Sequence, residues 1–293
     1  MLETLKSLLG SQTNLFWVTV ISLLVSSVVS LLFRRWETRD RLETEYKYEQ
    51  RKKLRELIGR YHGRVLTAAV SMNLRFFDLY DPAKSQWLGN RGQYFDSSVY
   101  RFMNVCSVIR QFEREALYVD GRIADERDFL FVKYLNALRL CMTDVELFKG
   151  LSYDVNEIDH FFADEFRERC DSCIDEGGNF IDYGSFKKRA QMDEASSYLE
   201  GVTLKPVLDF FDSLAPDKSL RWDRLVAFHL ILAGLINAFG YPEQEISKEQ
   251  IRLISEQFVS TKVLENLRDW LPKRGLAEES LTKTITCLVP KFI

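Results

Sequence analysis

The stretch LFWVTVISLLVSSVVSLLF, from Leu15 to Phe33, contains no ionisable side chain and is followed directly by Arg34 and Arg35. Fourteen of its nineteen residues are Leu, Val, Ile, Phe or Trp, and the other five are Ser or Thr. A helix of this length matches the ~30 Å hydrocarbon thickness of a bilayer. The sequence therefore predicts a transmembrane helix over residues 15–33.

Two other interpretations of this stretch compete with an anchor. A cleaved secretory signal needs a positive segment before an apolar core of about 7 to 15 residues, whereas this core is longer and the arginines follow it. Val28-Val29-Ser30 resembles a weak cleavage site, so this interpretation stays open. A buried helix of a soluble protein usually carries a polar stripe, which five scattered hydroxyl groups do not form. The residue pattern favours the anchor.

Positive charge lies on the carboxyl side of the predicted span. Lys6 and the terminal amine precede it, whereas eight basic residues follow within twenty positions. The positive-inside bias then places the carboxyl side in the cytoplasm and residues 1–14 outside, as a short extracytoplasmic tail. Five cysteines without the spacing of a disulfide framework agree with a reducing compartment. We therefore expect a single-pass cell-membrane protein with a cytoplasmic C-terminal domain.

The net charge of −3 is unevenly distributed. Residues 34–64 hold eleven basic and six acidic side chains, so they carry +5, and the chain from Val65 onward carries −8. A basic segment beside a bilayer is typical of one held near anionic lipid head groups, although an ordinary solvated helix has the same composition. The acidic body repels phosphates, so we expect no nucleic-acid partner.

Beyond the span the pattern is helical. Acid-first i, i+4 pairs indicate an exposed, charged stalk over residues 34–53: Glu37/Arg41, Glu43/Lys47 and Glu49/Lys53. From Leu54 apolar residues recur at the spacing of a helix packed on a core. Six prolines, fourteen glycines and the lack of long alternating runs argue against a sheet. We predict an all-α fold in which one N-terminal transmembrane helix continues into a cytoplasmic multi-helix bundle, residues 54–293.

Apolar periodicity, capping residues and breakers define the expected helices of this bundle. After the helix that continues the anchor to about residue 81, they cover approximately residues 99–120, 124–148, 156–173, 185–199, 204–214, 219–240, a helix that begins at the Ser247-x-x-Gln250 capping box, and an amphipathic piece at 276–288.

Leu225–Phe239 is a second strongly apolar stretch, in which His229 is the only ionisable side chain. It is apolar nearly all round and fifteen residues long. A membrane span needs nearer twenty residues, so we predict a central buried helix that ends at Gly240. A second membrane segment is the alternative.

Ser22, Ser26 and Ser30 recur every four residues and so share one face of the predicted span. Small residues on such a face let two helices approach closely, which predicts a homo-oligomer. Serines are also tolerated in any span, where they bond back to carbonyls of the preceding turn, so the pattern leaves both interpretations open.

The most suggestive polar cluster is Glu157, His160, Asp164 and Glu168, whose spacing places them on one face of the predicted helix 156–173. Glu-x-x-His is half of the di-metal motif of ferritin-like bundles, which need it twice. The other two histidines lack a glutamate at that spacing. A solvated acidic face is therefore favoured over a metal site.

The other sequence motifs do not indicate a catalytic or metal-binding site. Cys170-x-x-Cys173 is half of a zinc spacing without a second pair, so we expect two reduced cysteines. The sequence contains no P-loop, dinucleotide-binding or G-x-S-x-G motif. We therefore assign no catalytic, cofactor-binding or metal-ligating residue and expect no cofactor. Trp36 fits an interfacial aromatic belt, and Trp87 and Tyr94 flank a polar loop as a candidate binding surface.

Together these features predict a membrane-anchored helical interaction or scaffold module at the cytoplasmic face, which associates with itself or with a protein partner not named by the sequence. The alternative is a membrane-attached enzyme or effector, of the stress or antiviral defence type, with a site in the acidic helix around His160. A third interpretation is a lipid-surface regulator that acts through the basic segment.

Overall fold

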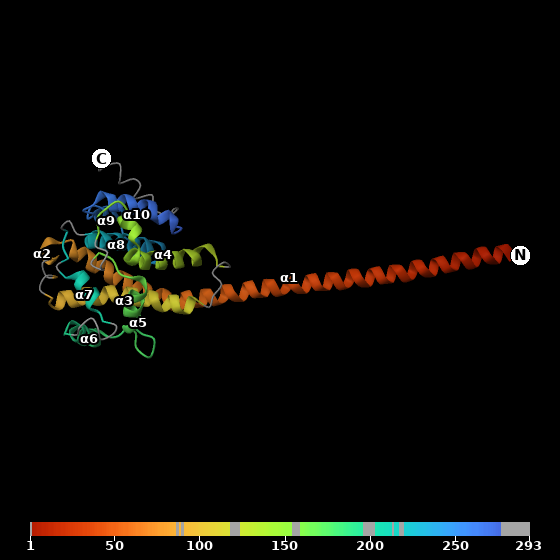
Figure 1. Cartoon of the computed structure of the whole chain (residues 1–293), viewed down its shortest axis with the longest axis horizontal. Coiled ribbons are helices and arrows are strands. Elements are labelled where there is room, and N and C mark those ends of the chain that lie inside the picture. The colour runs from red at the N-terminus through yellow and green to blue at the C-terminus, as the bar shows by residue number, and fades with distance from the viewer. Residues whose placement is uncertain are drawn as a thin grey trace. The chain divides into compact units, whose positions relative to one another are not determined.

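The computed structural model describes residues 2–85, 88, 91–117, 124–153, 159–195, 203–212, 214–216 and 220–276. Those residues form helices and the turns between them (Figure 1). Within them the only extended pairing is a single antiparallel bridge between Ile174 and Phe180. The predicted all-α fold class is therefore confirmed.

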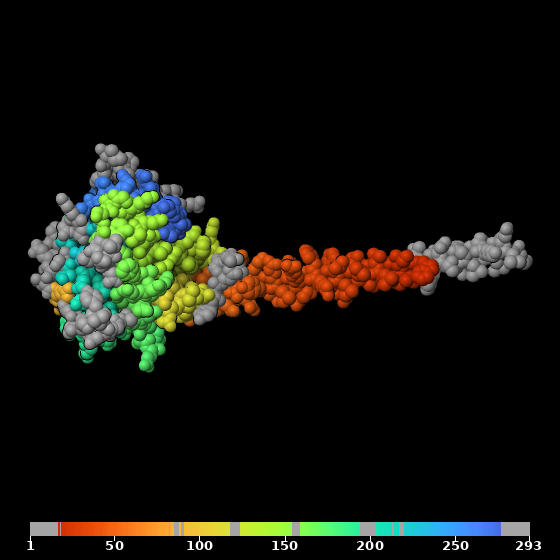
Figure 2. Space-filling model, viewed as in Figure 1, coloured from red at the N-terminus to blue at the C-terminus, as the bar shows by residue number. Residues whose placement is uncertain are grey.

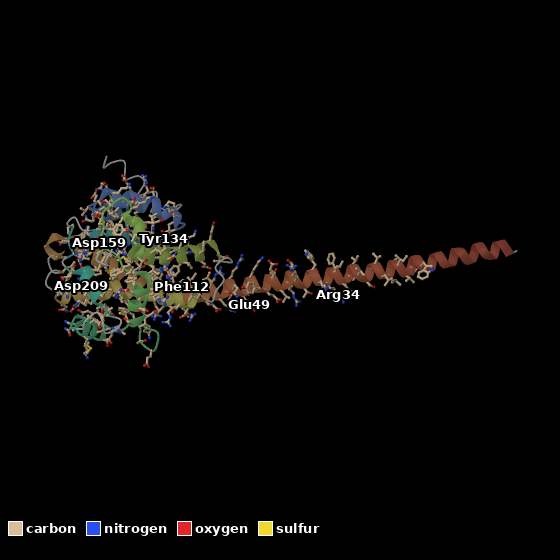
Figure 3. The ribbon with its side chains drawn as sticks, in the orientation of Figure 1. Arg34, Glu49, Phe112, Tyr134, Asp159 and Asp209 are labelled. Atoms are coloured by element: carbon tan, nitrogen blue, oxygen red, sulfur yellow. The ribbon has the colours of Figure 1, made fainter. Side chains whose placement is uncertain are left out.

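Contacts within the chain divide it into two compact units, Met1–Lys52 and Lys53–Ile293. The first unit is the N-terminal part of α1 (Leu2–Leu79). Its large apolar side chains are exposed, Phe33 to 64%, and none of its most apolar window is buried inside the protein. Arg34, labelled in Figure 3, is exposed as well. This unit has no core of its own within the described residues.

The second unit is a bundle of helices (Figure 1), and its atoms form one compact body in the space-filling view (Figure 2). After the C-terminal part of α1 its elements are, in chain order, α2 (Pro82–Ser85), α3 (Gln93–Ala116), α4 (Glu126–Thr143), the short η3 (Val145–Phe148), α5 (Ala163–Ser172), α6 (Tyr183–Ala195), α7 (Lys205–Phe211), α8 (Leu220–Phe239), the short η4 (Pro242–Gln244), α9 (Lys248–Ser255) and α10 (Thr261–Lys273).

Aromatic side chains join these helices into one core. The ring of Phe102 on α3 lies 5.1 Å from that of Phe211, 5.4 Å from Phe228 and 6.3 Å from Phe166, measured between ring centroids. Four helices, α3, α5, α7 and α8, therefore meet at one residue. Rings in such contacts contribute about 0.5–1.5 kcal/mol each beyond the burial of their surface.

Helix α8 is the central element of the bundle. It is buried along 89% of its most apolar window, and α4 packs along it, with α9 and α10 also in contact. A helix that is apolar on all sides has to be covered on all sides, and the surrounding helices do this. The prediction of a central buried helix over Leu225–Phe239 is therefore confirmed.

Two local signals end and begin helices as predicted. The Gly240 amide donates to the Ile236 carbonyl at 2.6 Å, and a Cβ at position 240 would come within 2.5 Å of that oxygen, so the close approach requires glycine. At the start of α9 the Gln250 amide donates to Ser247 Oγ at 3.2 Å, and the Ser247 amide donates to Gln250 Oε1 at 2.9 Å. This is the predicted capping box.

The predicted helix 156–173 is wrong in its first part. Helix α5 begins only at Ala163, and Phe162 before it has extended backbone angles. Phe161 explains the difference, because its amide donates to the Met142 carbonyl at 3.1 Å and its ring stacks on Phe166 at 4.7 Å. Packing against α4 and α5 thus holds the chain extended where periodicity predicted a helix. Residues 156–158 lie outside the described residues.

Other boundaries also differ from the prediction. The helix predicted over 124–148 ends at Thr143, because Asp144 turns the chain and its Oδ1 accepts a hydrogen bond from the Glu146 amide at 2.9 Å. The helix predicted from Val99 begins earlier, at Gln93. The amphipathic piece at 276–288 lies outside the described residues beyond Leu276.

Candidate functional site

Large apolar side chains that the structure describes in the apolar stretch of α1, such as Trp17, Leu24 and Phe33, are exposed. Ser22, Ser26 and Ser30 are exposed and recur every four residues on one helix, so they form one face. Trp36 is also exposed, and its ring contacts that of Phe33 edge-on at 6.0 Å. Nothing in the described part of the first unit covers these residues.

In the charged segment that follows, the predicted ion pair between Glu43 and Lys47 is formed. Lys47 Nζ lies 2.6 Å from Glu43 Oε1, and this contact lowers the pKa of the Glu43 carboxyl through a hydrogen bond and the lysine charge. Arg41 pairs at 3.5 Å with Glu45, four residues after it, and not with the predicted Glu37, four residues before it. Both pairs are exposed, and such pairs contribute little to stability.

The predicted acidic face around His160 is not formed. His160 precedes α5 and is buried, with its ring edge-on to that of Phe162 at 5.3 Å. Asp164 and Glu168 lie on α5 and are exposed, and Asp164 pairs with Arg167 at 2.7 Å. Glu157 lies outside the described residues. The histidine and the two carboxylates therefore occupy different environments.

The four described cysteines are buried and free of disulfides: Cys106, Cys141, Cys170 and Cys173. Burial raises the pKa of the Cys141 thiol to about 12 and that of Cys173 to about 11. These thiols are protonated at neutral pH and are poor nucleophiles. In the part of the chain that the structure describes, no group of three or more His, Cys, Asp or Glu side chains is arranged to hold a metal ion.

His229 on α8 is tied into the core by two hydrogen bonds. Its Nδ1 lies 2.7 Å from the Tyr80 hydroxyl, and its Nε2 lies 2.8 Å from Asn73 Oδ1. In the neutral tautomer that fits both contacts, Nε2 donates to Asn73 Oδ1 and Nδ1 accepts from the Tyr80 hydroxyl. Burial favours this neutral form, because it lowers the pKa of His229 well below its usual range. This histidine connects α1 to α8 and has a structural role.

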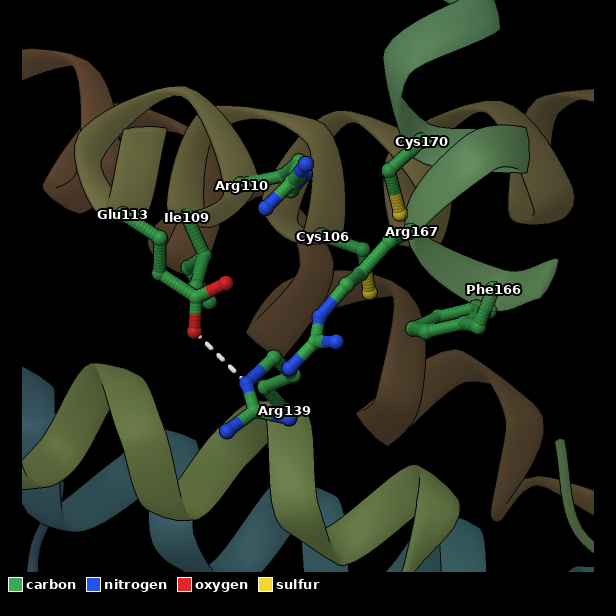
Figure 4. Close-up of a pocket in the computed structure, with 8 residues that line it drawn as sticks. All are labelled: Cys106, Ile109, Arg110, Glu113, Arg139, Phe166, Arg167 and Cys170. Carbon is green, nitrogen blue, oxygen red and sulfur yellow. Dashed lines mark hydrogen bonds and ion pairs between the residues drawn. The ribbon is translucent and has the colours of Figure 1, made fainter. Parts of the chain in front are cut away.

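A first surface cleft lies between α3, α4 and α5 and encloses about 740 Å³. Figure 4 shows a small adjoining pocket that shares Arg110, Glu113, Arg139 and Arg167 with this cleft and is also lined by Cys106, Ile109, Phe166 and Cys170. We call it the ion-paired cleft, because its arginines contact carboxylates: Arg110 with Asp171 at 3.0 Å, Arg139 with Glu113 at 2.6 Å, and Arg167 with Asp164 at 2.7 Å. A charged ligand would have to displace one of these partners.

A second cleft of about 610 Å³ is lined by α1, α3 and the start of α6. We call it the arginine cleft, after Arg75 and Arg101. Arg75 is only 8% exposed, and its guanidinium lies over the Tyr94 ring, 4.1 Å from the centroid. One nitrogen, Nη2, donates to Ser97 Oγ at 3.0 Å, whereas Nε and Nη1 have no hydrogen-bond partner among the described residues.

Arg101 lies in the same cleft and donates from Nη1 to the Ser71 carbonyl at 2.9 Å. Burial lowers the pKa of Arg101, and the positive charge of Arg75 lowers it further. Within the described residues neither arginine has a carboxylate at ion-pair distance. The two clefts therefore differ in that arginines are neutralised in the first and not in the second.

The sequence pointed to this second region only in part. Tyr94 was a candidate for a binding surface and does line the arginine cleft, whereas Trp87 lies outside the described residues. Arg75 and Arg101 were missed, because nothing in a single sequence shows that the faces of α1 and α3 meet. The available signal was the i, i+4 spacing of a serine before each arginine, Ser71 before Arg75 and Ser97 before Arg101, which places each serine and arginine on the same helix face.

No family model, no curated protein and no solved structure matches this chain. The arguments for its function therefore come from its own residues.

Proposed function

We propose that this chain is a single-pass membrane protein whose helical domain, at the cytoplasmic face, acts as an interaction module that associates with copies of itself. The observation that carries the proposal is the exposed apolar stretch of α1: within the described residues, none of its most apolar window is buried inside the protein. Exposed apolar surface costs about 25 cal/mol per Å² in water, and soluble monomers rarely present such a large patch. A bilayer removes this cost.

The orientation is inferred from the charges beside that stretch. Arg34 and Arg35 come directly after it, and the side chains of residues 34–49 are exposed. The positive-inside bias favours a cytoplasmic position for them, where they also lie near anionic lipid head groups. Each basic residue close to such a surface contributes about 1 kcal/mol to the attraction.

Fractionation of the full chain tests the anchor. After cell lysis and ultracentrifugation we expect the protein in the membrane pellet, resistant to high salt and alkaline washing and released by detergent. Intact mass of the pelleted protein should include residues 1–33, which separates an anchor from a cleaved signal. Protein in the supernatant without detergent, or a mass lacking those residues, would contradict the proposal.

Self-association rests on the face formed by Ser22, Ser26 and Ser30. Leucine at all three positions should keep the protein in the membrane but weaken its oligomers in detergent, measured by analytical ultracentrifugation. Ser27→Leu is the matched control, because Ser27 lies about 100° around the helix from Ser26. Equal association of the triple variant and the control would remove this face from the proposal.

The alternative enzyme site around His160 is not part of this proposal, because His160 lies before α5 and not on its exposed acidic face. His160 is buried apart from Asp164 and Glu168, and the buried thiols are protonated. The site suggested for an enzyme around His160 therefore has no structural support, and we do not propose it.

A further inference from the structure

Among the described residues, the two arginines of the arginine cleft have no carboxylate at ion-pair distance. The charge of Asp78 acts on Arg101 and that of Asp96 acts on Tyr183, but each carboxylate also pairs with a lysine: Lys84 lies 2.6 Å from Asp78, and Lys187 lies 3.4 Å from Asp96. Buried charges in proteins are normally paired, because burial without a partner is costly. Arg75 and Arg101 lack such a partner within the described residues, so the cleft suits an anion.

The geometry around Arg75 strengthens this point. The side chain is more than nine-tenths buried, and the two nitrogens without a hydrogen-bond partner among the described residues, Nε and Nη1, are themselves buried atoms, so a ligand in the cleft would meet the charge of the guanidinium and not these two donors. Its contact with the Tyr94 ring holds the guanidinium plane in place at the wall of the cleft. A guanidinium fixed in this way keeps a positive charge at the wall of the cleft, where it favours an anionic ligand.

The start of α3 adds to the positive potential. Gln93 and Tyr94, its first residues, line the cleft, and its N-cap Gly92 provides no side-chain hydrogen bond. The amide groups of a helix N-terminus carry partial positive charge and bind phosphates well. This end of α3 and the two arginines therefore favour the same kind of ligand.

The size and the other walls of the cleft indicate more than a bare ion. About 610 Å³ lies within the range of small-molecule sites, roughly 300–1,000 Å³. Tyr100 and Tyr183 line it, and their rings contact each other edge-on at 5.3 Å. The Tyr183 hydroxyl makes only a long contact of 3.4 Å, with the Gln93 carbonyl. Aromatic surface of this kind suits a planar ring.

We propose that the arginine cleft binds a nucleoside phosphate, with its phosphate beside Arg75 and Arg101 and its base against Tyr100 and Tyr183. Such a ligand is small and carries few charges, so the acidic body that disfavours a long nucleic acid does not exclude it. This site goes beyond the proposed membrane-anchored interaction module, and each can fail without the other.

Calorimetry on the full chain in detergent tests the site with adenosine monophosphate, guanosine monophosphate, adenosine and inorganic phosphate, each up to about 1 mM, the upper range of usual substrate levels. We expect a monophosphate to bind at least about tenfold more tightly than adenosine or phosphate. Arg101→Gln should weaken monophosphate binding about tenfold, as for the loss of one charge-assisted contact of roughly 1.4 kcal/mol. Its binding of adenosine should not change.

Two variants keep the result interpretable. Arg110→Gln is the matched control, because Arg110 lies in the ion-paired cleft with Asp171, and it should bind the monophosphate like the original protein. Tyr183→Ala removes an aromatic wall and should weaken the monophosphate without weakening inorganic phosphate. Melting temperatures without ligand show that each variant is folded.

Three outcomes would overturn the proposal. Neither monophosphate binds at the highest concentration, or Arg101→Gln binds it unchanged, or inorganic phosphate alone binds as tightly as the monophosphate. The last result would indicate a simple anion site, as for a phosphorylated side chain of another protein.

Discussion

The apolar stretch of α1 and the helix α8 are alike in length and apolar content, and both are long and apolar enough to cross a membrane. Their surroundings are opposite, because none of the first and 89% of the second is buried inside the protein. The residues on the carboxyl side of each helix differ as well. Arg34 and Arg35 come directly after the first stretch, whereas Gly240 follows the last residue of α8 and the chain leads into further amphipathic helices that contact it.

Apolar content alone therefore does not distinguish a helix that is buried in a protein core from one that is surrounded by lipid. In α8 the polar exceptions have specific partners inside the protein, as His229 has Tyr80 and Asn73. In the α1 stretch the polar exceptions are hydroxyl groups, which a helix in lipid satisfies through its own backbone. Substitutions at matched positions of the two helices can therefore separate a protein core from a proposed membrane span.

The largest expected effect comes from adding a charge to each helix. Ile231→Asp places a carboxylate where the side chain is fully buried on α8, and we expect a loss above about 4–5 kcal/mol, enough to unfold the domain. Leu24→Asp in the α1 stretch should leave the domain folded and cost about 2.5–3.5 kcal/mol of membrane insertion.

Thermal unfolding by circular dichroism and the fraction in the membrane pellet measure the two effects separately. If Leu24→Asp unfolded the domain, the α1 stretch would have a protein partner inside the same chain. A folded Ile231→Asp protein would show that α8 is not the centre of the core.

A large-to-small change gives the next effect. Phe228→Ala removes a ring that contacts Phe102 at 5.4 Å and Phe76 at 6.2 Å, so we expect a loss of about 3–5 kcal/mol in the free energy of unfolding. Phe33→Ala removes an exposed ring and should stay within about 0.5 kcal/mol. Denaturant midpoints with unchanged slopes give both values. Similar losses in the two variants would contradict the contrast between the helices.

The same residues show how much of this fold was predictable from sequence. The apolar run of α8, Gly240 and the Ser247 capping box act through neighbours within a few positions, so they were predicted correctly. The start of α5 was wrong because the Phe161 amide bonds to Met142, nineteen positions earlier in the chain, and a local pattern contains no trace of that contact.

The candidate site was less predictable for the same reason. Tyr94 stood out beside a polar loop, but the positive charge of the arginine cleft comes from Arg75 on α1 and Arg101 on α3. Each arginine alone resembles an ordinary solvated residue of an amphipathic helix. Only the packing of α1 against α3 shows that both lie in one cleft without a carboxylate partner, within the described residues.

A smaller effect is expected from the one acid of α8. Asp223 is buried and accepts hydrogen bonds from the Val259 amide at 2.7 Å and the Ser260 amide at 3.0 Å. Burial outweighs these bonds and raises the pKa of Asp223 to about 6 from 3.8. Because the folded state keeps the proton to higher pH, the contribution of this group is fully present below about pH 4 and is lost as pH rises through 6.

Asp223→Asn removes that titration, so stability curves of the original protein and the variant should differ in slope. Between about pH 4 and 7 the original protein should lose roughly 1–3 kcal/mol relative to the variant. Urea unfolding at several pH values measures the difference. The asparagine amide has only one acceptor oxygen, so the variant also loses some stability by an amount that does not depend on pH. Parallel curves of the free energy of unfolding against pH would therefore show that the pKa of Asp223 is not raised.

The smallest effect belongs to a polar pair on the exposed helix. Glu43 contacts Lys47 at 2.6 Å, and the contact lowers the pKa of Glu43, but both side chains are surrounded by solvent. Water screens such a pair and already solvates each charge, so Glu43→Gln should leave the melting temperature of the full chain unchanged at low and at high salt. A fall in melting temperature that appears only at low salt would show that this segment is held against another charged surface. In that case only the part of α1 before residue 43 would differ from α8 in its surroundings, and residues 43–53 would pack against another surface.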